Sequence, residues 1–213
     1  MKKAVLAAFV AAASFQAVGA ENIGSQHGYL DEGWYIGADI IDTTYKSDEL
    51  DGSPSSTSGA ISIGYDFKLA DSVVLGVETE YADYGKFDFP ITDRSSQNVH
   101  IKQIFSHDVQ AISFYLKPKY FVSNSPFYIG ALVGIGMYKV KSEIDTTGTL
   151  TINTFQITRS EKVSDNESET EFVYGLETGY ALNNNIILNA GYRMANLKHY
   201  EHDTWYVGLD YKF

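Results

Sequence analysis

The sequence contains no cysteine, only four prolines and, after its first 20 residues, no apolar run long enough for a membrane-spanning helix. Without cysteine the chain can form neither disulfides nor thiolate metal sites, and it cannot carry a lipid on an N-terminal cysteine. A spanning helix would need about 20 consecutive apolar residues. Basic residues are also scarce, with 16 Lys and Arg against 27 Asp and Glu for a net charge of −11. Because nucleic-acid phosphates require a basic surface, this balance argues against nucleic acid as a partner.

The first 20 residues have the pattern of a secretory signal peptide. Lys2 and Lys3 precede a short apolar run, and small residues stand before a cleavage site expected after Ala20. We therefore expect a protein exported through a cleaved signal. The expected segments are the signal peptide at 1–20, a short periplasmic N-terminal segment at 21–32 and a single β-barrel domain at 33–213.

The rest of the chain favours β-strands, with 16 Tyr and 12 Phe. Apolar residues alternate along eight stretches, at 33–46, 58–69, 73–86, 108–121, 126–141, 170–182, 185–198 and 204–213. The connections after the second, fourth and sixth stretches are short, whereas those at 47–58, 87–107 and 142–170 are long, polar and acidic. Short turns at one end and long loops at the other are typical of outer-membrane barrels. The sequence therefore predicts an all-β, eight-stranded antiparallel up-and-down transmembrane β-barrel with short periplasmic turns and long extracellular loops.

Alternation also separates two faces of these strands. In each strand, the odd-numbered and the even-numbered residues point to opposite faces, and we call each set a parity. The parity that holds the large apolar residues carries no charge. The opposite parity carries Asp39, Asp66, Lys68, Glu78, Glu80, Lys117, Lys119, Glu177, Arg193, Asp210 and Lys212. We interpret the apolar parity as facing lipid and the charged parity as facing the barrel lumen. The alternative fold is a soluble β-sandwich, which would have its charges outside. It remains possible only if both sheets bury every apolar face.

The inward charges predict a polar plug rather than a pore. Its expected centre is the charge network Glu78, Glu80, Lys117, Lys119, Glu177 and Arg193. We expect Arg193 to pair with Glu177 or Glu78, since a buried ion needs a partner. The glycines of the strands fall on the same parity and would leave room for these long side chains. An eight-stranded barrel is just wide enough to be filled by side chains, although a narrow ion path remains the alternative.

Aromatic residues near the strand ends indicate interfacial girdles, where amphipathic rings lie at headgroup level. Trp34 is the expected anchor at the periplasmic interface and Trp205 the expected anchor at the outer one. Pro118 falls on the lipid face inside the fourth strand, where it removes a ladder hydrogen bond, so we expect a bulge or distortion there.

The last strand carries the pattern Gly208-x-x-Tyr211-x-Phe213. With the signal peptide and eight strands, it resembles the small OmpA/OmpX-type outer-membrane β-barrel family, which includes opacity-like and Ail-like surface proteins. The resemblance implies that Gly208, Tyr211 and Phe213 form a C-terminal assembly signal for the outer-membrane assembly machinery, and that the last strand pairs with the first. It implies a location in the Gram-negative outer membrane, in contact with lipid and lipopolysaccharide.

The resemblance also implies a possible lipid-modifying enzyme, because some eight-stranded outer-membrane barrels resemble such enzymes with His, Ser or Asp at the outer rim, and two polar clusters fall there. Ser106, His107 and Asp108 are adjacent, but neighbours in a strand point to opposite faces, so they cannot all reach one site. His199 and His202 could hold a metal, but without a fixed third ligand they are a weak signal. We therefore expect no catalytic site, no cofactor and no metal.

The long connections are the segments most informative about function. Within 142–170, "TGTLTINTFQIT" alternates and suggests a strand extending beyond the membrane, whose edge could recruit a partner. The following "RSEKVSDNESETE" is expected to be a charged, mobile segment. The leading hypothesis is a monomeric surface protein with an interaction, adhesion or membrane-structural role, with a host or matrix partner for its loops. A small low-conductance channel is the second hypothesis and a rim-located lipid-modifying enzyme the third.

Overall fold

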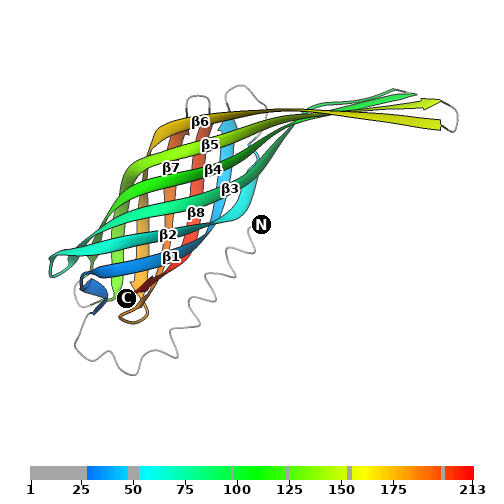
Figure 1. Cartoon of the computed structure of the whole chain (residues 1–213). Coiled ribbons are helices and arrows are strands. Elements are labelled where there is room, and N and C mark those ends of the chain that lie inside the picture. The colour runs from blue at the N-terminus through cyan, green and yellow to red at the C-terminus, as the bar shows by residue number, and fades with distance from the viewer. Residues whose placement is uncertain (1–27, 48–52, 97, 123–124, 153–154, 198–199) are drawn as a thin grey trace.

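The structure, a computed structural model, describes residues 28–47, 53–96, 98–122, 125–152, 155–197 and 200–213. Its strands are β1 (Gly33–Ser47), β2 (Ser55–Ala70), β3 (Val73–Ser95), β4 (Val99–Phe121), β5 (Phe127–Ile152), β6 (Phe155–Ala181), β7 (Ile186–Leu197) and β8 (Tyr200–Lys212). Each strand pairs antiparallel with the next, and β8 pairs with β1 from Tyr35↔Lys212 to Ser47↔Tyr200. The eight-stranded closed barrel is therefore confirmed (Figure 1).

The barrel has an apolar outer surface, as the parity assignment predicts. Along β4, buried and exposed residues alternate from Ala111 to Phe121, with Ile112, Phe114 and Leu116 exposed. The outward apolar band runs over 34–40, 61–69, 73–81, 112–120, 127–137, 172–182, 186–194 and 205–213. In the described residues, no helix is long and apolar enough to cross a membrane.

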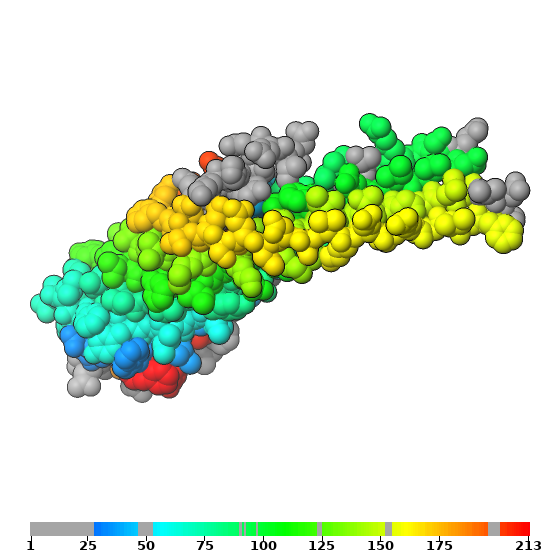
Figure 2. Space-filling view, turned by 45° about the horizontal axis from the view of Figure 1, so that its top comes forward, coloured from blue at the N-terminus to red at the C-terminus, as the bar shows by residue number. Residues whose placement is uncertain are grey.

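Four strands continue far beyond this band. Pairing of β2 with β3 stops at Gly59↔Asp83, and pairing of β6 with β7 begins only at Val173↔Ala195. Beyond those points β3, β4, β5 and β6 run on together as one sheet, here called the extension and defined as the described residues within 86–108 and 141–166. Figure 1 shows it leaving one side of the barrel as a long arm, which Figure 2 shows in space-filling form.

The extension corrects the prediction of long loops at 87–107 and 142–170. "TGTLTINTFQIT" contributes to extended strands as expected, but "RSEKVSDNESETE" is also strand, in β6. It stays extended because β5 pairs with it residue by residue, from Gly148↔Arg159 to Gly136↔Glu171. The charged composition of 159–171, which suggested mobility, is therefore compatible with a paired β-strand whose side chains face water on both sides of the sheet.

At Pro118 the sequence predicts a bulge or local distortion, and the structure shows a local interruption without a bulge, because the pairing with β5 skips 117 and 118. β4 keeps its register with β3 through Pro118, and pairing with β5 resumes unshifted at Lys119↔Gly130, so the proline inserts no bulge. Register shifts occur instead in β3, between Asp83 and Gly85 and further out. Gly85 has φ = 79°, a left-handed conformation that glycine adopts without strain.

Candidate functional site

The barrel interior holds stacked layers of paired charges, and Lys117 is at the centre of the middle layer. Its Nζ atom lies 2.7 Å from Oε2 of Glu177 and 3.2 Å from Oε2 of Glu78. All three side chains are buried. One cation thus bridges acids carried by two distant strands, β3 and β6, across the lumen.

Tyrosines complete this layer, and the prediction omitted them. Tyr35 donates a hydrogen bond to Glu78 at 2.8 Å, while Tyr128 and Tyr206 donate to the two oxygens of Glu177 at 2.6 and 2.8 Å. A buried carboxylate needs several donors to offset its lost hydration, and these hydroxyls supply them. The signal was present in the sequence, since all three tyrosines lie on the inward parity.

The outer layer is built on Arg193. Its Nη1 atom lies 2.7 Å from Oε2 of Glu80, and the Tyr115 hydroxyl is 3.5 Å from the other oxygen of that carboxylate. The guanidinium carbon also lies 5.3 to 5.8 Å from the ring centroids of Tyr84, Tyr115 and Tyr206. The expected pairing of Arg193 with Glu177 or Glu78 is therefore wrong, because Lys117 holds both of those acids.

The lowest layer closes the periplasmic end. Lys119 and Lys212 lie 3.3 and 3.1 Å from the two oxygens of Asp66. Lys212 also donates to the backbone oxygen of Tyr29, in the short 3-10 helix Gly28–Leu30, and the Tyr29 ring packs on Phe121. Lys68, which the parity assignment placed in the lumen, is exposed instead, beside a register shift between Lys68 and Ala70.

Glycines leave room for these side chains. A Cβ atom on Gly64 would collide with the Tyr35 ring, and one on Gly191 would collide with the Tyr206 ring. Both tyrosines are hydrogen-bonded to the buried acids of the middle layer. A larger residue at either glycine would therefore displace a ring that the charge network uses.

A cluster of aromatic side chains and two histidines fills the outer mouth, above the apolar band. The Tyr45 ring lies 4.7 Å from His202, 5.4 Å from His107 and 4.9 Å from Phe87. Burial lowers the pKa of His202 to about 3 and that of His107 to about 4. Both rings are therefore neutral at physiological pH and act as packing groups.

The rim clusters do not assemble into a site of the kind considered from the sequence. His107 Nδ1 lies 3.0 Å from Ser142 on the inner face, whereas the Ser106 hydroxyl donates to Asp88 on the outer face. His199 lies outside the described residues. Among the residues that the structure describes, no group of three potential metal ligands occurs.

The predicted assembly signal lies on β8 beside the start of β1. Tyr211 and Phe213 are exposed on the outer surface with ring centroids 5.4 Å apart, and the Phe213 amide donates to the Trp34 carbonyl. Gly208 faces inward, where a Cβ atom would collide with the Asp39 carboxylate. These positions allow two aromatic rings to face lipid next to the closing seam.

The two expected interfacial anchors lie on the outer surface at opposite ends of the band. Trp34 is 57% exposed near Phe213, and its ring meets the Tyr65 ring edge-on. Trp205 is 64% exposed at the other end of β8, with its ring 4.7 Å from that of Tyr192. Both rings are exposed on the outside of the barrel, as expected for tryptophans that lie at a lipid interface.

These features define a class of protein. A closed barrel with an apolar exterior and a charge-paired polar interior is a β-barrel that spans a lipid bilayer. Residues 4–213 match the family described as "Outer membrane protein beta-barrel domain", and the chain belongs to this family. It is therefore an outer-membrane protein of the small barrel type, as the resemblance implied.

Solved structures with similar folds include three outer-membrane barrels. Ail, the attachment invasion locus protein of Yersinia pestis, solved with the heparin analogue sucrose octasulfate, is 19% identical; the match covers 86% of this chain and 99% of Ail, with a TM-score of 0.49. Neisserial surface protein A is 18% identical over 86% of this chain and 99% of its own, with a TM-score of 0.45. OprG from Pseudomonas aeruginosa is 13% identical over 85% and 96%, with a TM-score of 0.42. No curated protein matches the chain. These identities are too low to transfer a ligand or a residue role.

Proposed function

We propose that this protein is a surface interaction protein, in which a plugged barrel anchors the extension and the extension binds an extended segment of a partner. The observation that carries the proposal is the free edge of β6. Among the described residues, no strand pairs with β6 on its β7 side between Phe155 and Phe172. A strand edge of this length offers backbone N–H and C=O groups to another chain.

Charge on this edge suggests the chemistry of the partner. On the inner face of β6, acids occupy every second residue from Asp165 to Glu171, namely Asp165, Glu167, Glu169 and Glu171, and Glu161 lies further out on the same face. A strand added alongside β6 would place its own side chains opposite these positions. We therefore expect the partner segment to carry Lys or Arg at alternate positions, in a host or matrix protein.

The barrel interior supports an anchoring role for the domain. Lys117, Lys119 and Arg193 are all buried and ion-paired within the lumen. Breaking such pairs to pass an ion would cost several kcal/mol at each layer. On this proposal the six predicted network residues act as a plug, and Trp34 and Trp205 hold the barrel at the two membrane interfaces.

The test removes the extension without disturbing the pairing below it. Phe89↔Phe105, Phe105↔Ile144 and Ile144↔Val163 are consecutive pairs across the four strands. Replacing 90–104 and 145–162 each by Asn-Gly keeps those pairs in register and supplies a suitable hairpin turn. This variant loses residues 155–162 of the free edge but keeps Asp165 to Glu171, so cells displaying it should bind host cells, matrix proteins or serum factors more weakly. The barrel should still keep its folded mobility on a gel run without heating.

A charge variant distinguishes the β6 edge from the extension as a whole. Glu167→Lys with Glu169→Lys should abolish binding, whereas Asp108→Lys with Asp145→Lys, on the central strands β4 and β5, should leave it intact. Unchanged adhesion and serum survival of the truncated protein, with surface exposure confirmed, would contradict the proposal and favour a purely structural role. Loss of binding in both charge variants would contradict the assignment to the β6 edge.

A further inference from the structure

The outer end of the extension has an unusual side-chain arrangement. This end, here called the tip, comprises 91–101 and 148–159 among the described residues. Pairing across β4, β5 and β6 aligns Val99, Leu150 and Ile157 in one row on the inner face, and all three are exposed. Phe155, one row further out on β6, is 77% exposed. Water therefore contacts a continuous apolar surface on four neighbouring side chains.

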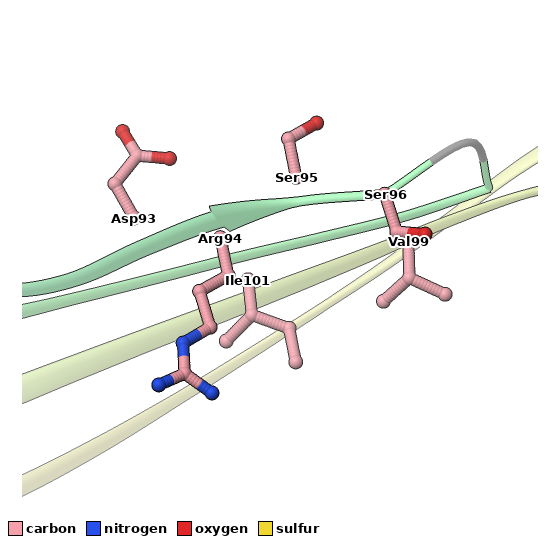
Figure 3. A pocket seen from close by; sticks show the side chains of 6 residues that line it. All are labelled: Asp93, Arg94, Ser95, Ser96, Val99 and Ile101. Carbon is pink, nitrogen blue, oxygen red and sulfur yellow. The ribbon is translucent and has the colours of Figure 1, made fainter.

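Arginines flank the next row inward. Arg94 pairs with Ile101, Ile101 with Gly148, and Gly148 with Arg159, so this row has a cation at each end. Figure 3 shows Arg94, Val99 and Ile101 on one side of the β3–β4 hairpin, with Asp93 and Ser95 on the other. Alternate residues of a strand are about 7 Å apart, so the arginines lie that far behind the apolar row.

The charge of the tip is opposite to that of the whole chain. Arg94, Lys102 and Arg159 lie at or beside it, with Asp93 as the one acid within it, whereas the chain has a net charge of −11. The acids of β6 begin behind the tip, at Glu161. Apolar groups in front and cations behind are the arrangement by which a protein inserts shallowly into an anionic bilayer, with its cations at headgroup level.

The alternative occupant is a second copy of the chain, and the charges disfavour it. Two tips stacked face to face would bring their arginines together, with only Asp93 on each opposite face to offset them. From Ile112, in the apolar band, β4 runs 13 residues to Val99, roughly 40 Å of strand. The tip therefore lies far beyond the apolar band along the strand, at the end of the arm, where a surface that faces the cell can reach it.

We propose that the tip docks on the anionic phospholipid bilayer of a facing membrane, with Val99, Leu150, Phe155 and Ile157 entering the interface and Arg94 and Arg159 binding headgroups. The tip is separate from the free edge of β6 that the proposed function uses. The acids of β6 at the base of the extension take no part in lipid binding. Attachment of the tip to lipid and strand addition at the edge are independent, so either can fail alone.

Vesicle flotation of the full chain in nanodiscs tests the proposal. The protein should float with phosphatidylcholine vesicles containing phosphatidylserine and bind phosphatidylcholine alone much more weakly. Phe155→Ser with Ile157→Ser should weaken binding by at least about tenfold. Arg94→Gln with Arg159→Gln should weaken binding to the anionic vesicles by about fivefold for each arginine, in a salt-dependent manner.

Val163 provides a matched control. It lies on the same strand and face as Ile157 and is equally exposed, at 60% against 61%, but it is surrounded by the acids of β6. Val163→Ser should bind vesicles like the unmodified protein. Because the chain has no cysteine, Phe155→Cys and Val163→Cys can each carry one polarity-sensitive fluorophore. The label at 155 should shift to the blue on anionic vesicles, and the label at 163 should not.

Several outcomes would overturn the proposal. These are absence of flotation with anionic vesicles, equal binding to both vesicle types, and equal loss in Val163→Ser and in the tip variants. Self-association that the tip variants abolish, without vesicle binding, would identify a second copy as the occupant. A difference in gel mobility between heated and unheated samples verifies that the barrel of each variant is folded. The charge variant Glu167→Lys with Glu169→Lys should keep vesicle binding, which separates this test from that of the β6 edge.

Discussion

Removing the guanidinium of Arg193 tests the charge network at its outermost pair. Arg193 is 3% exposed and Glu80 is 1% exposed, with 2.7 Å between Nη1 and Oε2. Arg193→Met keeps much of the side-chain volume but leaves the Glu80 carboxylate buried beside a hydroxyl donor alone. Breaking one side of a buried pair typically costs about 3 to 5 kcal/mol. Loss of the contacts with three tyrosine rings adds to this, by up to about 2 kcal/mol for a desolvated cation. Since these terms are not additive, we expect the free energy of unfolding to fall by about 4 to 5 kcal/mol.

A double variant separates the unpaired charge from the loss of packing. Arg193→Met with Glu80→Gln removes both charges, so no ion is left uncompensated in the lumen. Replacing a buried ion pair by neutral groups is often close to neutral in stability. The double variant should therefore be more stable than Arg193→Met alone by about 2 kcal/mol or more.

The measurement is urea unfolding of the folded protein in lipid vesicles, followed by tryptophan fluorescence. Arg159→Met is the matched control, since Arg159 is exposed in the extension and its loss should change stability by no more than about 0.5 kcal/mol. The reasoning fails if Arg193→Met unfolds at the same urea concentration as Arg159→Met. It also fails if the double variant is no more stable than the single one.

Three further predictions concern assembly, conductance and pH. Tyr211→Ser with Phe213→Ser should leave the protein unfolded in the periplasm, and normal outer-membrane levels in cell fractionation would count against the assembly signal. In planar bilayers the pure protein should give at most small, intermittent conductance because its lumen is filled, so large steady steps would favour the channel hypothesis. His202 is neutral in the folded state down to about pH 3 but protonates near pH 6.5 when unfolded. The unfolded state then binds more protons in this window, so stability should fall as pH drops below about 6.5, by up to about 1.4 kcal/mol per pH unit. His202→Gln should show a shallower fall, and an identical pH dependence of unfolding would refute the contribution.

The barrel could be predicted because lipid imposes one strict rule on every strand. A residue facing hydrocarbon must be uncharged, so a single parity of β4, for example, reads Ile112, Phe114 and Leu116 without interruption. Parity also identifies which charges face inward. It carries no information on which inward charges meet, because that depends on the stagger of strands around the barrel. Arg193 therefore received the wrong partner although its direction was predicted.

The extension was mistaken for loops because the rule stops where the lipid stops. Above the band, both faces of a strand can be polar, and the segment following Arg159 in β6 then looks like a disordered chain. The remaining evidence for a strand is non-local, since each residue of β6 has a partner on β5. Likewise, composition alone could not show that Tyr35, Tyr128 and Tyr206 donate to buried acids, although their parity indicated that they face inward.

The outward parity of β5 shows where the membrane ends and why the extension is more than a spacer. Within the apolar band, the outward-facing residues of β5 include Ile135 and Met137. Immediately above the band they are Lys139, Lys141 and Glu143. The inward positions of β5 keep apolar residues above the boundary, at Val140, Ile144 and Leu150, with Ser142, Thr146 and Gly148 between them. On β5 the apolar side therefore turns from lipid towards the axis of the barrel at the membrane surface, whereas the inner face of β6 carries acids there, from Asp165 to Glu171. A hairpin needed only to connect strands would gain nothing from an apolar face in water, where such a face favours association. The persistence of that face to Leu150 and Ile157 is the physical reason to seek the function of this protein at the end of the extension and along its edge.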